Sequence, residues 1–519
     1  MPSISIDIIL FVVFLLLNLI IGIKYRGKKQ SFKEYAIGNK NFSTATLTAT
    51  IVATWASGSM FFNGIEQSYS NGLYYMIPVI VGSTFSWLAT GYIIGPRMGT
   101  LLNHVSIADA MSSIYGKGIQ LIAGLSTLLG NVGIIAIQFK VISKVLATLF
   151  NYQGPEVTII AASIIIVYSA FGGIRSVTFT DVVQFITFGT LLPALALVIW
   201  QHIEDPNQVI HTLTTHPNLS FKKLLKGGTQ LMDTLALICY FMIPSLAPQI
   251  FQRMAMARDI GQIKRSIAYS AGLLLVIRLF IIWIAILLLT DNPTLKTSEV
   301  IVYLIDKHTY IGLKGFLGVG IIALAMSTAD SALNSCAVLV ANDILPPLKI
   351  TKQPSVPVAT ITTFVIGFFS ILLALSIQNI LQILLLSANF DLPILTIPML
   401  ITIFGFRTSK RAMYIGIGAG FSITAFLLLY FKNINSFVPG MLANLTFLLG
   451  SHYLLKEKGG WIKQETETGL LEVDQAYSLS WKERWAQLKP IKPLTYLEKN
   501  LPNKEYYYPL LAFYLLTAT

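Results

Sequence analysis

Long apolar runs constrain the fold of this 519-residue sequence more than any other feature. A membrane-spanning helix needs about 20 mostly apolar residues, because the hydrocarbon core of a bilayer is about 30 Å thick. Such runs follow one another almost without a break to about residue 455. They predict an all-α polytopic membrane protein with about thirteen spans. We place these spans approximately at 5–23, 44–68, 73–96, 119–150, 156–172, 177–200, 229–251, 267–290, 312–341, 356–376, 379–405, 412–431 and 435–455.

The charged residues agree with a membrane protein. They make up only 12% of the chain, against about 25% in a typical soluble domain. A net charge of +13 could indicate nucleic-acid binding. However, most Lys and Arg residues lie in short loops between apolar runs, where they orient membrane helices. We therefore expect a lipid bilayer as the surroundings of the chain and no nucleic acid as its partner.

The positive charge alternates from loop to loop. The loop after the first span holds Lys24, Arg26, Lys28, Lys29 and Lys33, and every later odd-numbered loop also carries Lys or Arg. The even-numbered loops are poor in both, apart from two long ones that can cross a membrane regardless of charge. This pattern predicts the inner (plasma) membrane, with the N-terminus outside and the C-terminus in the cytoplasm. We expect a membrane domain over 1–455 and a polar cytoplasmic tail over 456–519, which ends in a short apolar segment.

The second span is interrupted by small residues. Its sequence from Ala53 to Gly64 is ATWASGSMFFNG. An unwound helix at this point would free backbone carbonyls, which suit a hard cation such as Na⁺. The alternative is that the small residues only let neighbouring helices pack closely.

The ninth span carries a group of hydroxyls and one carboxylate. Ser327 and Thr328 are adjacent, and Asp330 and Ser331 follow them. Hydroxyl oxygens are neutral, hard ligands, and together with free carbonyls they would form a weak Na⁺ site that can release its ion. The alternative is that each hydroxyl bonds to a carbonyl of its own helix.

Two glycines interrupt the chain before the sixth span. Gly172 and Gly173 break the helix, and Asp181 then lies about one turn into the span. A carboxylate at this place could attract a cation that leaves toward the cytoplasm. An equally good alternative is a capping role for Asp181 at free backbone N–H groups.

The seventh span contains Pro244 and Pro248, which free backbone groups and break a helix. Spans two and seven are therefore interrupted at corresponding places in two five-helix halves, spans 2–6 and 7–11. Such paired breaks indicate a midplane site in a transporter built from inverted repeats. Charges inside spans are expensive unless they have a partner or line a cavity. We expect Arg278 in span eight to pair within the bundle and Asp391 in span eleven to line the solute pathway.

Taken together, these segments resemble the sodium:solute symporter family, which includes proline, pantothenate and sugar symporters. The resemblance rests on three groups of residues in a fixed order: Gly172-Gly173 with Thr180-Asp181-Val182-Val183-Gln184, Pro248-Gln249 with Gln252-Arg253, and Met326-Ser327-Thr328-Ala329-Asp330-Ser331 with Leu333-Asn334. It implies a leucine-transporter-like fold of two inverted five-helix repeats with peripheral helices. It also implies one sodium site.

The resemblance further implies a role for individual residues. The carbonyls of Ala53, Ala56 and Leu324 and the hydroxyls of Ser327 and Thr328 would bind the coupling Na⁺. Asp181 would assist ion release on the cytoplasmic side. The residues expected near the solute are Trp55, Met60, Pro248 and Gln249.

Two functions fit these features. The first is a Na⁺-coupled symporter that moves a small organic solute by alternating access. The second is a transporter-like sensor that signals through its C-terminal region to a kinase domain or protein. No motif indicates covalent catalysis, so we do not expect an enzyme, and the sequence does not identify the solute.

Overall fold

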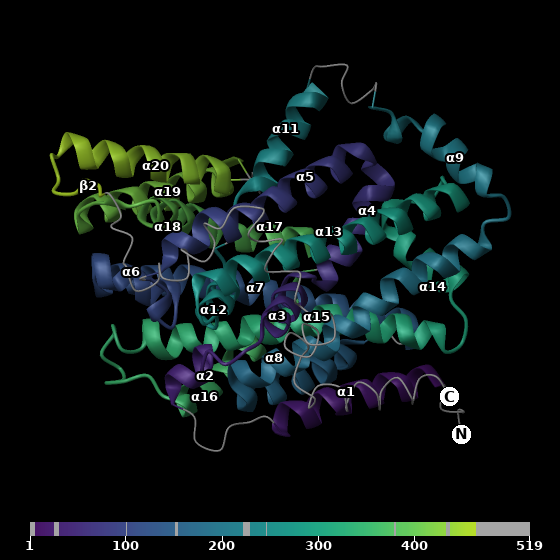
Figure 1. Ribbon diagram of the computed structural model, residues 1–519, viewed down its shortest axis with the longest axis horizontal. Helices are drawn as coiled ribbons and strands as arrows, with labels where there is room; N and C mark the ends of the chain where they lie inside the picture. The colour runs from purple at the N-terminus through teal and green to yellow at the C-terminus, as the bar shows by residue number, and fades with distance from the viewer. Residues whose placement is uncertain are drawn as a thin grey trace, which may run out of the picture.

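The computed structural model describes residues 6–24, 31–99, 101–150, 154–221, 229–244, 246–377, 380–431 and 436–462. These residues form a bundle of helices (Figure 1). The first half of the described chain contains α1 (Ile6–Lys24), α2 (Phe32–Ile37), α3 (Thr44–Trp55), α4 (Gly58–Asn71), α5 (Leu73–Ala89), η1 (Thr90–Ile94), η2 (Gly95–Met98), η3 (Leu101–Asn103), α6 (Ile107–Tyr115), α7 (Lys117–Phe150), α8 (Pro155–His202), α9 (Pro206–Thr215) and η4 (Pro217–Leu219). The second half contains α11 (Thr229–Met242), α12 (Pro248–Ala255), α13 (Ile260–Asp291), η5 (Thr297–Glu299), α14 (Val300–His308), α15 (Leu313–Leu339), η6 (Val340–Ile344), α16 (Val356–Ser376), α17 (Ile380–Asp391), η7 (Leu392–Thr396), α18 (Ile397–Ile403), β1 (Phe406–Arg407), α19 (Lys410–Phe431), α20 (Phe437–Leu454) and β2 (Gly460–Trp461).

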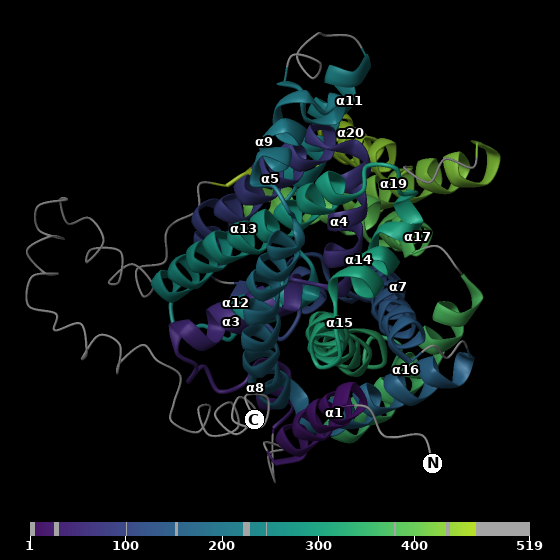
Figure 2. The ribbon, with the colours of Figure 1, turned by 90° about the vertical axis from the view of Figure 1, so that its right-hand side faces the viewer.

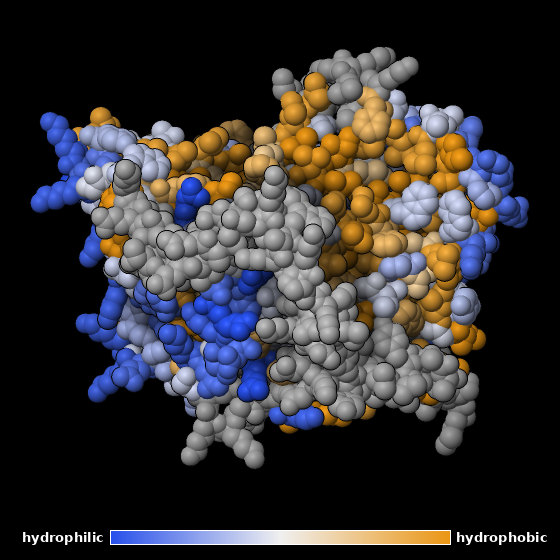
Figure 3. All heavy atoms as spheres, in the orientation of Figure 1, coloured by the Kyte–Doolittle hydropathy of each residue, from blue (hydrophilic) through white to orange (hydrophobic). Residues whose placement is uncertain are grey.

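Nine helices within the described residues are long and apolar enough to cross a membrane. This number is lower than the expected thirteen for a structural reason. The expected spans 44–68 and 229–251 are each divided into two short helices, so neither forms one long helix. The expected spans 156–172 and 177–200 are joined in α8, and the nine helices do not include α20 in the expected span 435–455. Apolar side chains cover the outer surface over α5 and α11 (Figure 3), as expected for a multi-pass membrane protein.

The break in the second span lies between α3 and α4. Ala56 ends α3 with a ψ of 91°, whereas a helical residue has a ψ near −42°. This rotation turns the Ala56 carbonyl away from the direction of the helix. Ser57 then caps α4, because its side chain accepts a hydrogen bond from the Met60 N–H. The predicted interruption is confirmed.

The break in the seventh span lies between α11 and α12. Helix α11 ends at Met242, and α12 begins at Pro248. Proline fits the first turn of a helix, where its missing N–H is not needed. The interruption predicted from the two prolines is therefore confirmed.

Helix α8 changes direction at Gly173. This residue has φ 62° and ψ −173° inside an otherwise helical segment. Only glycine adopts this conformation without strain. The two glycines that were expected to break the helix therefore produce a kink, and the helix continues on both sides.

Helix α15 lies in the middle of the bundle (Figure 2). It packs against α7, α8, α1 and α16, and every residue from Leu317 to Leu339 is buried. Its N-terminus is held by α1, because the Asp7 carboxylate accepts hydrogen bonds from the N–H groups of Gly312 and Gly315. The hydroxyls of the ninth span are thus fixed on the best-buried helix of the bundle.

A two-stranded antiparallel sheet closes one end of the described chain. Strand β1 pairs with β2, so that Phe406 lies opposite Trp461. This sheet was not expected in an all-α protein, and it attaches the start of the expected tail to the loop before α19. The remainder of the tail, 463–519, lies outside the described residues.

Candidate functional site

The broken second span faces the hydroxyls of α15. The Ser327 hydroxyl donates a hydrogen bond to the Ala53 carbonyl at 2.7 Å and contacts the Leu324 carbonyl at 3.0 Å. Ala53 and Ser327 are fully buried. Residues 274 positions apart in the chain are therefore joined at the end of α3.

Thr328 makes the same kind of contact one residue later. Its hydroxyl lies 3.0 Å from the Thr54 carbonyl and 3.3 Å from the Leu324 carbonyl. The Thr54 carbonyl was not among the expected ligands. The expected ligand Ala56 is two residues further on, where the backbone leaves the helix.

These oxygens suit a sodium ion. Three backbone carbonyls and two hydroxyls gather without a carboxylate among them, and hard oxygen ligands are what Na⁺ requires. Each of the two hydroxyls donates to a neighbouring carbonyl, so neither is left without a partner. A neutral set of ligands holds a cation weakly, which a site that must release its ion requires.

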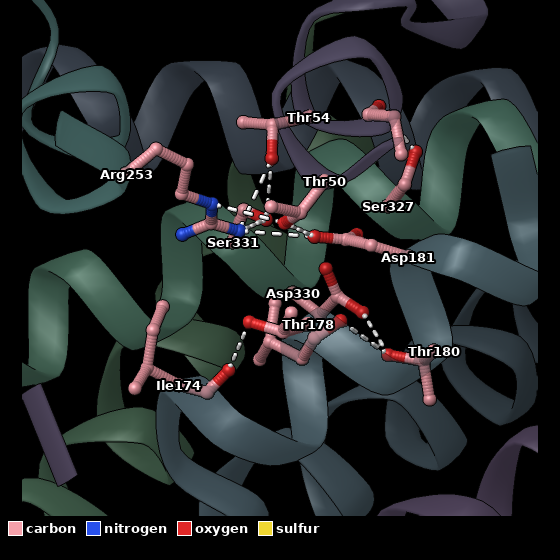
Figure 4. Close-up of polar contacts among 12 residues, drawn as sticks. Thr50, Thr54, Ile174, Thr178, Thr180, Asp181, Arg253, Ser327, Asp330 and Ser331 are labelled. Carbon is pink, nitrogen blue, oxygen red and sulfur yellow. Dashed lines mark hydrogen bonds and ion pairs between the residues drawn. The ribbon is translucent and has the colours of Figure 1, made fainter. Parts of the chain in front are cut away.

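Asp181 lies next to this group but pairs with an arginine. Its Oδ2 is 3.0 Å from Arg253 Nη2, and both side chains are fully buried. The Thr50 hydroxyl donates a hydrogen bond to the same carboxylate oxygen and accepts one from Arg253 Nε at 3.1 Å. Asp181 lies inside a span, as expected, but it does not cap a helix end, because it lies within α8 and contacts α3 and α12 (Figure 4).

Arg253 also connects the ion pair to the two helices of the candidate sodium site. Its Nη2 lies 3.1 Å from the Thr54 hydroxyl on α3 and 2.6 Å from the Ser331 hydroxyl on α15. The network therefore shares Thr54 with the Ser327–Thr328 group (Figure 4). Sequence reasoning gave Arg253 no role, although a charge next to two polar residues in a broken span is a sign of buried pairing.

A second buried carboxylate, Asp330, lies close to this network. Its Oδ2 accepts a hydrogen bond from the Tyr168 hydroxyl at 2.8 Å, and the Thr180 hydroxyl lies at 3.4 Å. Asp330 Oδ1 and Asp181 Oδ1 have no hydrogen-bond partner within the described parts of the chain. The region therefore holds two buried carboxylates and one guanidinium.

The residues expected near the solute are divided between two places. Trp55, at the end of α3, packs edge-on against Trp87 with ring centroids 5.3 Å apart. Met60 lies in the first turn of α4, directly after the break. Both residues are thus at the break in the second span, where the carbonyls of the candidate sodium site also lie.

The other expected residues meet through α7. Gln249, beside Pro248 at the start of α12, donates a hydrogen bond to Asn131. One turn earlier on α7, the Thr127 hydroxyl lies 2.9 Å from Asp391 Oδ1. Asp391 is partly exposed and has no ion-pair partner in the described portion of the chain. A polar path therefore crosses α7 and links the break in the seventh span to Asp391.

Arg278 differs from the expectation that it pairs within the bundle. Its side chain is buried in α13. No residue of the described segments forms an ion pair or a hydrogen bond with it. The sequence predicted that Arg278 lies deep in a span, but not that it has no counter-charge among the described residues.

Comparison with known proteins gives one family. The sequence model of the sodium:solute symporter family matches residues 35–420. The chain is 26% identical over 196 residues to a sodium/pantothenate symporter of Haemophilus influenzae, which covers 37% of this chain and 40% of that protein. It is 23% identical over 456 residues to a high-affinity choline transporter of Caenorhabditis elegans, covering 80% of this chain and 76% of the relative. The match to the pantothenate symporter thus spans less than half of that protein's length.

One solved structure has the same fold. It is a Na⁺-coupled sialic acid symporter in a substrate-bound, outward-open state, with a TM-score of 0.75 and 19% sequence identity. The alignment covers 86% of this chain and 98% of the other. At this level of identity the likeness concerns the fold alone.

Proposed function

Because the chain belongs to the sodium:solute symporter family, we propose that it is a Na⁺-coupled secondary transporter of a small organic solute. Na⁺ and the solute bind near the middle of the bilayer, and the two halves of the bundle alternate access to that site. One observation supports this proposal most strongly. The carbonyls at the break after α3 face two adjacent hydroxyls of α15.

In this proposal Na⁺ replaces the hydroxyl protons as the partner of the carbonyls. Ala53, Ala56 and Leu324 supply backbone oxygens, and Ser327 and Thr328 turn their hydroxyl oxygens toward the ion. Because α3 and α15 each supply ligands, bound Na⁺ holds the two helices together. The ion therefore favours the state in which they are close, which is the basis of coupling.

Asp181 assists the exit of the ion. It lies on the same network as Thr54, and its free Oδ1 can attract a departing cation. Arg253 keeps this attraction weak, since the guanidinium offsets part of the carboxylate's charge. The solute pathway runs past Trp55 and Met60 on one side of the midplane and past Pro248, Gln249 and Asp391 on the other.

We further propose about thirteen spans, with spans 2–6 and 7–11 as inverted repeats. The two broken helices, the kink in α8 and the apolar helix α20 support this count, because each adds a crossing to the nine long helices of the described residues. The loop charges support an N-terminus outside the inner (plasma) membrane and a C-terminus in the cytoplasm. The relatives described above are transporters, and no comparison supports the alternative of a sensor joined to a kinase.

The solute can be sought among those of the relatives. The purified chain would be reconstituted into liposomes and supplied with radiolabelled pantothenate, sialic acid or choline, with an inward gradient of either Na⁺ or K⁺. We expect at least one solute to accumulate with Na⁺ and not with K⁺. Equal accumulation with both ions would contradict Na⁺ coupling. No accumulation of any solute under either ion would contradict transport of solutes of this kind.

A further inference from the structure

Arg278 is a buried guanidinium that has no counter-ion among the described residues. Its side chain is only 6% exposed. Among the described residues, the ion pairs connect His104 with Asp109, Arg253 with Asp181, His308 with Asp291, and Lys314 with Asp306. None of these involves Arg278. Its surroundings therefore differ from those of Arg253, which is enclosed by a carboxylate and three hydroxyls.

An unpaired charge of this kind is costly. A charged side chain at the centre of a membrane domain costs about 2.5–3.5 kcal/mol on insertion scales, and usually has a partner or lines a pathway. Arginine keeps its charge under all ordinary conditions. With 6% exposure the residue is also too enclosed to reach lipid headgroups by extending outward. The guanidinium therefore lacks a compensating anion among the described residues, and a bound anion would supply one.

The position of Arg278 along the bundle follows from the contacts of α13. Near the start of α13, the Ser270 hydroxyl lies 3.3 Å from the Thr48 carbonyl on α3. Further along, a Cβ added to Gly64 on α4 would meet Ile281 at 2.7 Å. Helix α13 therefore runs parallel to the broken second span. Arg278 precedes Ile281 by three residues, so it lies level with the first turn of α4, next to the break.

One tyrosine interacts with the guanidinium, and further aromatic residues lie next to that tyrosine. Tyr75 on α5 interacts electrostatically with Arg278, and Tyr240 on α11 interacts in the same way with Tyr75. The ring of Phe241 packs against Tyr75 with centroids 6.4 Å apart. Helix α11 is one half of the broken seventh span, and α4 is one half of the broken second span. Arg278 thus lies among the half-helices that border the proposed solute site.

We propose that Arg278 binds a carboxylate of the transported solute, so that the substrate class is organic anions; this rests on the proposed transport function. The guanidinium offers two parallel N–H groups that match the two oxygens of a carboxylate. The hydroxyl of Tyr75 can donate a further hydrogen bond to the same group. The solute neutralises the buried charge, and a Na⁺ bound at the break would add to the attraction for an anion.

Matched solutes test the charge requirement. Wild-type chain in liposomes with an inward Na⁺ gradient would be supplied with labelled pantothenate, its uncharged alcohol panthenol, sialic acid, its uncharged methyl ester, and choline. We expect Na⁺-dependent uptake of at least one carboxylate and none of its uncharged analogue. Na⁺-dependent uptake confined to choline or to the uncharged compounds would overturn the inference. Absence of Na⁺-dependent uptake for every compound would instead overturn the proposed function.

Variants at one position test the residue. We expect Arg278→Gln to raise the KM for the carboxylate about a hundredfold, since one member of a buried charge pair is lost. Arg278→Lys keeps the positive charge but loses the two parallel N–H groups, and should raise the KM about tenfold. The matched control is Val276→Ala, on the exposed side of the same helix, which should leave uptake unchanged. Wild-type KM in Arg278→Gln would show that the arginine is only hydrated and would overturn the inference.

Folding is checked separately. Na⁺ binding to detergent-solubilised Arg278→Gln would be followed by the fluorescence of the tryptophans, two of which lie at the break. A Na⁺ response equal to that of wild type, together with the increased KM, supports a role in solute binding. A lost Na⁺ response, with Arg278→Lys equally inactive, would show a structural role and contradict the inference.

Discussion

Arg253 Nη2 lies 3.0 Å from Asp181 Oδ2, and the two side chains are fully buried where α3, α8 and α12 meet. The pair is enclosed by the hydroxyls of Thr50, Thr54 and Ser331. A buried ion pair is most costly when only one partner is removed, because the other charge is then left uncompensated. This property distinguishes pairing from two independent contributions to stability.

We therefore predict that Asp181→Asn destabilises the protein by about 3–5 kcal/mol, and Arg253→Gln by a similar amount. The double variant should be destabilised by clearly less than the sum of the two. The stability of all three variants would be measured in detergent by thermal unfolding. Where unfolding by urea is reversible, it gives the free energy of unfolding of each variant. Additive losses would show that the two residues do not act as a pair.

The kink in α8 depends on one glycine. Gly173 has a φ of 62°, so Gly173→Ala should cost about 1–3 kcal/mol through backbone strain. Gly189→Ala is the matched control on the same helix, because a Cβ there meets nothing within 4 Å. This control should stabilise the protein by up to about 1 kcal/mol. Equal melting temperatures for the two variants would contradict the structural role of the kink.

Acidification should loosen α14, the short helix between α13 and α15. Asp291 Oδ2 accepts hydrogen bonds from the Tyr303 hydroxyl at 2.6 Å and from His308 Nε2 at 3.0 Å. Burial lowers the pKa of His308 below its ordinary value of 6.5 by more than Asp291 raises it, and His202 and Lys307 also oppose protonation. Burial raises the pKa of Tyr303 to about 12, so its phenol remains a donor.

The neutral form of His308 is therefore the one that the folded protein favours. Its contribution to stability is present above pH 6.5 and is lost as the pH falls through the lowered pKa. Hydrogen exchange at 300–308, corrected for intrinsic rates, should increase between about pH 7.5 and about pH 5.5. His308→Gln can still donate to Asp291 but does not titrate, so it should reduce this pH dependence. An unchanged pH dependence in the variant would assign the effect to another group.

The breaks in the second and seventh spans could be predicted because their signals are local. Ser57 is a capping residue within a run of small residues, and Pro248 fits only the first turn of a helix. The hydroxyls of Ser327 and Thr328 were predicted as a group for the same reason. Their contacts with Ala53 and Thr54 depend on packing between α15 and α3, which the resemblance to a family anticipated for Ala53 but not for Thr54.

Other features have no local signal. Arg253 meets Asp181 across 72 residues of sequence and Thr50 across 203. The pairing of β1 with β2 involves two residues on each strand, too few for a periodic pattern. The sequence predicted that Arg278 lies deep in a span. It could not predict that no described residue supplies a counter-charge, because that depends on which side chains pack around it.

The sodium site itself is tested by removing both hydroxyls of α15. Na⁺-dependent uptake of the transported solute would be measured as a function of Na⁺ concentration for wild type, for the double variant Ser327→Ala with Thr328→Ala, and for Thr187→Val. Thr187 is a suitable control because it is buried in α8 and bonds only to its own helix. Loss of Na⁺-dependent uptake in the double variant, with wild-type behaviour in the control, is the predicted result. An unchanged Na⁺ dependence in the double variant would contradict the assignment of the site.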